Sequence, residues 1–433
     1  MRMRLIRKSI KNIWQIIVIV WLVFAYQLML NMVPDEVKLI DGDLSKLDIS
    51  MPVTFECRDS GKRFIDTSVM ENQQLQSSMD KAGAERNEID MASDTVVLRA
   101  KLFGIIPIKD VQADIVAEQE VYASGENIGI YVQTDGIFVI GTGNFEGMDG
   151  VLYAPAQNVL KSGDYICAVD GVELENKEAL MDAVDKCEGK SLVLRIRRNG
   201  ETLELYIQPK LSKEETYKLG VWVRDDLAGI GTLTYISQDG SYGALGHAVT
   251  DMDTGSMLEV GTGKLYNSRL VGIVKGESGK PGELSGVINY EEKYCMGDIE
   301  ENCERGIYGT LHEKNNLLEH AVAYPVGYKQ DIEPGEAEII SDIDGTIAHY
   351  KIRITEVNYR KNKENKSILF EVEDAALLES TGGIVQGMSG SPMIQNGRLI
   401  GAVTHVFVDD AKKGYGIFIE DMLNHDGWIE NNF

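Results

Sequence analysis

A serine held between glycines is the sharpest chemical signal in this sequence. Ser389 lies in the run GMSGSP (387–392), which is followed by a predicted strand, an Asn-Gly turn and a second strand. Glycines on both sides of a serine permit a tight turn in which the hydroxyl projects and neighbouring N–H groups converge. We therefore predict that Ser389 is a nucleophile and that Gly387 and Ser389 supply an oxyanion hole. An ordinary glycine-rich turn is the alternative.

A serine nucleophile of this kind needs a general base, and the chain has 6 histidines. His247, in the run YGALGHAVTDMDTG, lies between the end of a small-residue strand and a polar turn. It precedes Ser389 by about 140 residues, as expected where base and nucleophile belong to different barrels, and we predict it as the base. His405 follows the serine hairpin in an apolar strand and is the second choice. The others occur in polar or charged stretches and should be at the surface: His312, His320, His349 and His425.

The base is expected to be oriented by a carboxylate. Asp374 ends the predicted strand SILFEVED, fifteen residues before Ser389, and is our choice for this role. Asp251 is the alternative because it lies close to His247 in the sequence. A residue only four positions from the base is more simply one that caps the intervening turn. With Asp374 the chain order is His, Asp, Ser, as in the two-barrel proteases.

Residues 213–433 must supply the scaffold for this site. Short predicted strands dominate the region and are separated by Gly and Asn turns, a pattern typical of a barrel or a pair of barrels. The whole chain has 44 glycines but only 7% aromatic residues, which favours turns and strands over long helical bundles. We therefore expect a mainly β protein whose C-terminal half is a trypsin-like double β-barrel serine protease domain.

Residues 99–212 combine predicted strands with one helix. A hairpin precedes YICAVDG (165–171), a helical stretch at 177–189 and two strands that meet at an Asn-Gly turn. This order resembles a PDZ domain of the bacterial protease type. In that family an apolar-Gly-apolar loop leads into a strand beside a helix and leaves an edge that accepts a peptide. Ile128, Gly129 and Ile130 match the loop, so the resemblance implies a peptide-binding site there; a core strand of a small α+β domain is the alternative.

Residues 1–34 predict a cytoplasmic basic tip followed by a transmembrane helix. Residues 13–33 are apolar except for three amide side chains, and 21 residues of helix reach about 31 Å, close to the hydrocarbon thickness of a bilayer. Five basic residues and no acidic one precede this run, which places the rest of the chain on the extracytoplasmic side. A cleaved signal peptide is the alternative, but no small-x-small cleavage site follows. Residues 35–98 contain few apolar clusters and are predicted to be a stem.

The charge balance argues against nucleic-acid binding. The chain has 43 Lys and Arg against 68 Asp and Glu, a net charge of −25, with no dense basic face after the N-terminus. No metal is expected, because Cys295, Cys303, His312 and His320 lack the short spacings of structural zinc sites, and no cofactor is expected. Cys295 and Cys303 are close enough in sequence to bridge if a turn lies between them.

Roughly the last three quarters of the chain resembles the stage IV sporulation protein B family, whose members are membrane-anchored serine endopeptidases of endospore-forming bacteria with a PDZ domain. The resembling runs are LFGIIPIK (102–109), IGIYVQTDGIFVIG (128–141), ALGHAVTDMDTG (244–255), KPGELSG (280–286), GGIVQGMSGSPMIQNGRLIGAVTHVFV (382–408) and GYGIFIEDML (414–423). By this resemblance the family's base falls on His247, its nucleophile on Ser389 and its acidic partner on Asp374. The family's Asn-Thr pair before a Gly-Ile-aromatic-Gly run is Asn302-Cys303 here, which leaves the role of Asn302 open.

The resemblance also implies a biological role. Family members are signalling proteases that the forespore secretes into the space between its two membranes. There they cleave themselves and a membrane-bound regulator of an intramembrane metalloprotease, which leads to processing of a late sigma factor. A catalytically inactive scaffold that only binds peptides through its PDZ domain is the alternative. The presence of all three predicted catalytic residues favours the endopeptidase.

Overall fold

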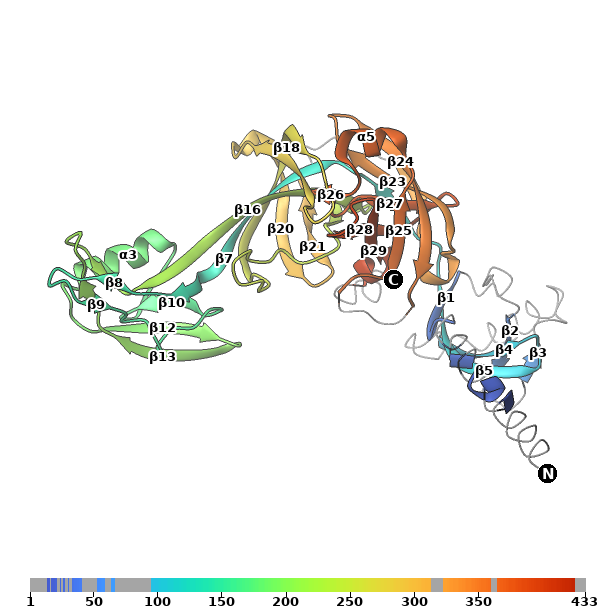
Figure 1. Ribbon diagram of the computed structural model, residues 1–433, viewed down its shortest axis with the longest axis horizontal. Coiled ribbons are helices and arrows are strands. Elements are labelled where there is room, and N and C mark those ends of the chain that lie inside the picture. The colour runs from blue at the N-terminus through green and yellow to red at the C-terminus, as the bar shows by residue number, and fades with distance from the viewer. Residues whose placement is uncertain are drawn as a thin grey trace, which may run out of the picture.

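The computed structural model describes residues 95–312, 322–359 and 364–424. In the N-terminal part it describes 33–40, 53–58, 64–66 and the helical positions 14–15, 17–21, 24, 26–27 and 30. Two β-barrels stand side by side, with a PDZ-like domain beyond the first and a small N-terminal sheet beyond the second (Figure 1). The prediction of a mainly β protein with PDZ-like and protease-like barrel domains is confirmed.

The first barrel is a ring of six strands. It closes because β7 pairs with β16 on one side and with β18 on the other. Around the ring the strands are β7 (Asn127–Thr142), β16 (Val221–Ile236), β17 (Ser241–Ala244), β21 (Gly306–Leu311), β20 (Cys295–Cys303) and β18 (Val260–Val274). Shorter elements flank the ring: β6 (Glu120–Ala123), β19 (Gly282–Ile288), β22 (Val322–Pro325) and the 3-10 turn η4 (Glu292–Tyr294).

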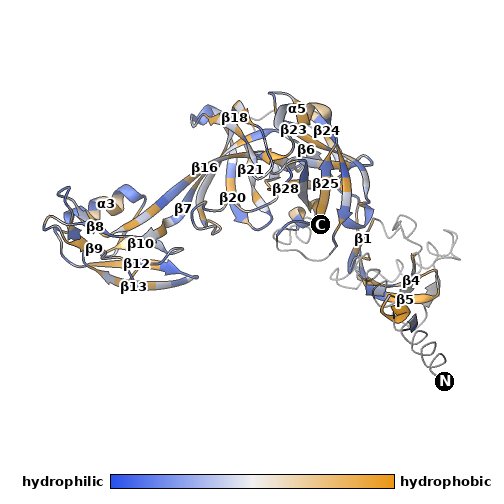
Figure 2. Ribbon diagram, viewed as in Figure 1, coloured by the Kyte–Doolittle hydropathy of each residue, from blue (hydrophilic) through white to orange (hydrophobic). Residues whose placement is uncertain are grey.

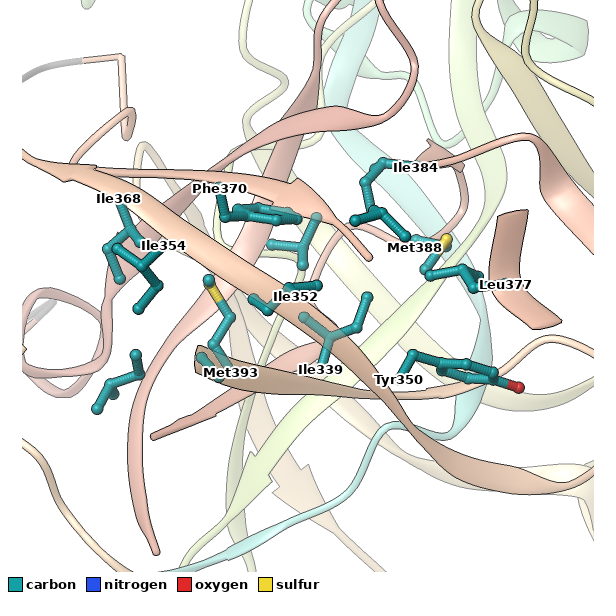
Figure 3. Close-up of a cluster of buried hydrophobic side chains, with 14 of the residues drawn as sticks. Ile339, Tyr350, Ile352, Ile354, Ile368, Phe370, Leu377, Ile384, Met388 and Met393 are labelled. Atoms are coloured by element: carbon teal, nitrogen blue, oxygen red, sulfur yellow. The ribbon is translucent and has the colours of Figure 1, made fainter. Parts of the chain in front are cut away.

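The second barrel is closed and contains the loop of the predicted nucleophile. Its strands are β23 (Gly335–Asp342), β24 (Ile347–Val357), β25 (Ile368–Val372), β29 (Lys413–Phe418), β28 (Arg398–Val406) and β27 (Pro392–Gln395). Beside them lie η5 (Lys329–Asp331), α5 (Ala375–Thr381), β26 (Val385–Gln386) and α6 (Ile419–Leu423). Figure 3 shows the buried cluster that fills this barrel, in which Leu377 of α5 lies close to Met388. Met388 is the residue before Ser389, so the core holds the nucleophile loop in place.

The PDZ-like domain is inserted into the first barrel. β7 and β16 leave the barrel as a paired ribbon, whose ladder runs from Asn127 opposite Thr232 to Thr142 opposite Val221. Between the two strands lie β8 (Phe145–Glu146), β9 (Leu152–Tyr153), β10 (Tyr165–Val169), β11 (Val172–Glu173), α3 (Lys177–Lys186), β12 (Leu192–Arg198), β13 (Glu201–Ile207), β14 (Lys210–Leu211) and β15 (Tyr217–Lys218). The predicted division into 99–212 and 213–433 therefore needs correction. The first barrel begins with the first half of β7, which pairs inside the barrel, and resumes in the second half of β16.

Part of the predicted stem, residues 35–98, is folded. A five-stranded sheet contains, in order, β1 (Glu36–Ile40), β5 (Ile106–Val116), β4 (Thr95–Leu102), β2 (Val53–Arg58) and β3 (Phe64–Asp66). Val37, Leu39 and Phe55 are buried against Leu98 and Val111 from the following hairpin. Isolated apolar residues of the stem are thus buried, because the later strands β4 and β5 supply the rest of the hydrophobic core.

The predicted membrane-spanning run, residues 13–33, lies partly outside the described residues. In the part of the chain that the structure describes, no helix is both long and apolar enough to cross a membrane.

Candidate active site and peptide-binding edge

A cavity of about 1060 Å³ lies where the two barrels meet, and it contains the two residues with the strongest sequence signals. His247 lines it from the first barrel, just after β17, and Ser389 lines it from the second, between β26 and β27. Gly387 and His405 also line the cavity. These residues come from separate segments of the sequence, and the fold brings them to one site.

The serine loop has the tight turn that its glycines predict. Gly387 and Gly390 have φ angles of 98° and 97°, a region that favours glycine. A Cβ on Gly390 would also clash with the carbonyl oxygen of Thr232 on β16. The Ser389 hydroxyl donates to the carbonyl of Thr404 at 3.0 Å, so in this structure it is held by β28 and not by His247.

Strand β16 of the first barrel holds the serine loop from the other side. The N–H of Thr232 donates to the Ser389 carbonyl at 2.9 Å, and its hydroxyl donates to the Gly387 carbonyl at 2.8 Å. The hydroxyl of Thr234 donates to the Gly390 carbonyl at 2.8 Å. These three bonds fix the positions of carbonyl groups on both sides of the nucleophile. No local sequence signal marks these threonines, because their role depends on contact between the barrels.

His247 has the protonation state of a general base. Its Nδ1 lies 2.9 Å from the Ala248 carbonyl. A carbonyl only accepts hydrogen bonds, so Nδ1 carries the proton and Nε2 keeps a free lone pair. Burial lowers the pKa of His247, while the bond to Ala248 raises it by a smaller amount. The imidazole is therefore neutral at neutral pH and able to accept a proton.

His405 packs beside the base. The ring centroids of His247 and His405 are 5.5 Å apart, and the rings are tilted by 40°. Burial, together with the charges of His247 and Lys366, lowers the pKa of His405 to about 4. Its Nδ1 is buried and has no hydrogen-bond partner among the described residues. The second-choice base is thus a wall of the same cavity.

The structure does not bring Asp374 to His247. Asp374 is the N-cap of α5, where its carboxylate accepts the N–H groups of Ala376 and Leu377 at 2.9 and 3.1 Å. It does not line the cavity. The end of a strand followed by a helix is a position where an Asp caps equally well, and the sequence could not separate the two roles.

Asp251, the alternative carboxylate, is also engaged elsewhere. It is fully buried, pairs with Arg224 and accepts the N–H groups of Asp253 and Thr254 at 3.1 and 2.9 Å. It is a turn-capping residue, as its spacing suggested. Neither predicted carboxylate is bonded to His247, and the Ala248 carbonyl occupies the position that a triad carboxylate would take.

Asn302 has a structural role near the base. Its side chain accepts the N–H of Val249 at 2.8 Å and donates to the carbonyls of Val249 and Leu258, both at 2.9 Å. These bonds fix the segment that begins at His247. Cys295 and Cys303 are both free thiols and lie at opposite ends of the extended strand β20, so they do not bridge.

The remaining histidines lie away from the cavity or outside the described residues. His312 pairs with Asp298 at 3.1 Å and His349 with Glu338 at 2.9 Å, both at exposed positions. His320 and His425 lie outside the described residues.

The predicted position of the peptide-binding loop is wrong. Ile128, Gly129 and Ile130 lie in the barrel half of β7, with β16 on one side and β18 on the other, so no edge is open. Both isoleucines are buried. A Cβ on Gly129 would lie 2.7 Å from the side chain of Ile288, so the glycine is required by close packing of β19.

A second apolar-Gly-apolar run, Leu219-Gly220-Val221, lies where a peptide-binding loop is expected, before a strand with an open edge beside a helix. Gly220 has a φ of 72° and leads into the PDZ half of β16. Residues 221–224 pair with β7 on one side, and no strand in the described part of the chain pairs with their other side. The open edge faces α3, which is fixed at its start by Lys177, bonded to Asp225 at 2.6 Å, and at its end by Asp185, bonded to Tyr217 at 3.2 Å. Met181, between these two contacts, is 66% exposed.

The comparisons with known proteins agree with the protease assignment. Residues 215–423 match the family model described as SpoIVB peptidase S55, which confirms the resemblance for that segment and supports a serine peptidase. The search of curated proteins gave no match.

Among solved structures, the chain is similar to the PDZ domain of the SdrC-like protein from Listeria monocytogenes (22% identity, 21% of this chain and 90% of that chain, TM-score 0.18). It is also similar to the Rv3671c protease in its inactive form (16% identity, 46% and 84%, TM-score 0.24). A third match is the HtrA-type protease AlgW with a decapeptide (10% identity, 72% and 66%, TM-score 0.25).

Proposed function

From the peptidase S55 match over residues 215–423, we propose that this chain is a membrane-tethered serine endopeptidase with Ser389 as nucleophile and His247 as base. One observation carries the proposal. Ser389, in the glycine turn, and His247, with a free Nε2 lone pair, lie far apart in the sequence. They line the same cavity between the barrels.

The reaction follows from the positions of these groups. A substrate carbonyl enters the cavity, and the Ser389 hydroxyl turns from the Thr404 carbonyl towards His247. Nε2 takes the hydroxyl proton as Oγ attacks, and the N–H groups of Gly387 and Ser389 bind the oxyanion. The imidazolium then gives its proton to the leaving amine, the acyl group stays on Oγ, and water attacks it with His247 again as base.

The carbonyl of Ala248 replaces a carboxylate in this scheme. It holds the Nδ1 proton and the ring orientation, but its partial charge stabilises an imidazolium less than a carboxylate would. We therefore expect slow turnover, which suits a protease that acts once on a few regulatory substrates. The proposed substrates are the chain itself and a membrane-bound regulator of an intramembrane metalloprotease, in the space between the forespore membranes. These finer assignments rest on the family resemblance.

The second candidate function is a peptide-binding scaffold without catalysis. It is favoured by the hydrogen bond from Ser389 to Thr404 and by the absence of a bond from either predicted carboxylate to His247. In that case the open edge of β16 beside α3 would be the working site.

Labelling with a fluorophosphonate probe separates the two functions, because only an activated serine reacts readily. The full chain in detergent should be labelled at Ser389, and Ser389→Ala and His247→Ala should each abolish labelling and peptide cleavage. Ser391→Ala is the matched control: this hydroxyl lies two residues away, is buried and bonds to Ser341 at 3.3 Å. Loss of labelling in Ser391→Ala but not in Ser389→Ala would refute the assignment, and an unlabelled parent chain that still binds peptide would favour the scaffold.

A further inference from the structure

The hairpin between β4 and β5 ends in an exposed apolar tip. Phe103, Ile105 and Ile106 expose 65%, 79% and 51% of their surfaces. The turn is tight: Phe103 and Gly104 have φ angles of 51° and 71°. A left-handed backbone conformation is unfavourable for a bulky residue by about 1 to 2 kcal/mol. An aromatic residue at Phe103 is therefore not explained by the stability of the turn itself.

The residues behind the tip are basic, although the chain is acidic. Residues 99–109 read RAKLFGIIPIK and contain three basic residues and no acidic one, within a chain of net charge −25. Arg99 and Lys109 form ion pairs on the body of the sheet, with Asp110 and Asp35. These pairs compensate both charges, so it is the apolar tip that matches a membrane surface, through its hydrocarbon layer.

The tip also lies alongside the apolar N-terminal run. The hydroxyl of Tyr26 donates to the carbonyl of Ile108 at 3.3 Å. Leu30 packs against the buried cluster that includes Leu102 and Ile108, the residues that flank the tip. Figure 2 shows hydrophobic residues of β4 and β5 at this end of the molecule. The base of the hairpin is thus in contact with the described residues of the apolar run.

We propose that Phe103, Ile105 and Ile106 insert into the membrane interface next to the N-terminal anchor. This rests on the membrane tethering proposed above. If the apolar run spans the bilayer as a helix up to Leu30, the last described helical position, Tyr26 lies four residues, or about 6 Å, inside that end. Interfacial apolar groups lie about 5 to 10 Å deep, so a tip at the level of Tyr26 is at the correct depth.

A bilayer suits the tip better than a protein partner. Stable protein interfaces bury roughly 800 Å² on each partner, whereas this tip offers three side chains on a narrow turn. A membrane needs no pocket that matches the tip. With the anchor as the first point of contact and the tip as the second, the tilt of the N-terminal sheet would be fixed. The sheet, and the barrels that follow it, would then be held at one orientation to the membrane.

Quenching by brominated lipids tests the proposal on the full chain. Ile105→Trp is reconstituted in phosphatidylglycerol and phosphatidylethanolamine vesicles, with and without lipids brominated near the head-group end of their chains. Tyr206→Trp, at a 74% exposed position on β13 of the PDZ-like domain, is the control. The emission added at position 105 should fall with brominated lipid, and that added at position 206 should not. Adding Phe103→Asn, which suits the left-handed turn, should reduce the quenching at position 105 without lowering the thermal midpoint.

Two companion measurements separate this proposal from the proposed function. Flotation of the vesicles reports the N-terminal anchor, and cleavage of a soluble peptide reports the catalytic site. If the Ile105→Trp variant floats and cleaves but its added emission is not quenched, the tip insertion alone is overturned and a protein partner is indicated. A chain that does not float overturns both the anchor and the tip, whereas loss of cleavage with intact quenching affects only the catalytic assignment.

Discussion

His247 and His405 lie with their ring centroids 5.5 Å apart, yet only His247 has its Nδ1 fixed by a backbone carbonyl. That bond leaves the Nε2 lone pair of His247 free and gives the two rings different roles. Burial keeps both rings neutral at neutral pH, because it lowers both pKa values. The neutral state avoids the repulsion that two adjacent imidazolium ions would have.

The pH dependence of cleavage should reflect the neutral base. Because the pKa of His247 is lowered from 6.5, its protonation, and hence the loss of kcat/KM, should occur only as the pH falls below that value. A profile of kcat/KM on a short peptide checks this. His405→Gln should leave the acid limb in place, because the limb belongs to His247. An acid limb centred above pH 6.5 would contradict the assignment.

The stability of the fold should have its own pH dependence through His405. Its pKa is about 4 when folded and near 6.5 when unfolded. Between these values the unfolded state binds more protons, so the stability contributed by the neutral ring is complete above pH 6.5 and is lost towards pH 4. Thermal midpoints measured over this range should fall less in His405→Gln than in the parent. Parallel curves for the two proteins would show that this ring is not responsible.

Substitutions at Asp374 should distinguish a helix N-cap from a catalytic carboxylate. As the N-cap of α5 it can be replaced by Asn with little effect, whereas Asp374→Ala should cost about 1 kcal/mol. α5 packs through Leu377 against the cluster that contains Met388, so activity should fall with stability in the Ala variant. As a triad member, Asp374→Asn would instead lower turnover by about four orders of magnitude. Turnover and thermal midpoints of both variants decide the matter.

The open edge of β16 should govern the choice of protein substrate. Met181→Glu places a charge beside this edge and should reduce cleavage of the chain itself or of a folded partner, while cleavage of a short peptide is unchanged. Tyr206→Glu, exposed on the same domain, is the control. Gly129→Glu should behave differently: with Ile288 at 2.7 Å it should disrupt the first barrel and abolish both activities. Equal processing by Met181→Glu and the parent would show that the edge is not used.

Thr232 should position the nucleophile loop through its hydroxyl. Thr232→Val removes the bond to the Gly387 carbonyl, a loss of about 1 kcal/mol, or roughly fivefold in rate if the oxyanion hole is disturbed. Thr232→Ser keeps the hydroxyl and should keep most of the activity. The effect should appear in kcat more than in KM, because the loop acts on the transition state. Equal values of kcat for the Val and Ser variants would argue against this role.

The sequence predicts which residues meet in the cavity better than it predicts the connectivity of the domains. Ser389 can be predicted because the turn around it requires glycines. His247 can be predicted because a polar turn that follows a strand is recognisable from a short stretch of sequence. The peptide-binding loop was misplaced because Ile128-Gly129-Ile130 and Leu219-Gly220-Val221 have the same pattern, and only strand pairing separates a closed position from an open one. Thr232, Thr234 and the Ala248 carbonyl could not be found at all, since their roles depend on contacts between distant segments or on a backbone group.

The insertion of the PDZ-like domain constrains the order in which the chain assembles. In the first barrel Ile128 pairs with Gly231, across the whole inserted segment. Closing a loop of about 100 residues costs roughly 4 kcal/mol in chain entropy. If the inserted domain forms first, β7 and β16 are already joined at Thr142 and Val221, and their ladder can extend into the barrel residue by residue. The cavity with His247 and Ser389 then forms only after residues 143–220 have folded, so lesions in that segment should slow maturation of the protease even where they leave the peptide edge intact.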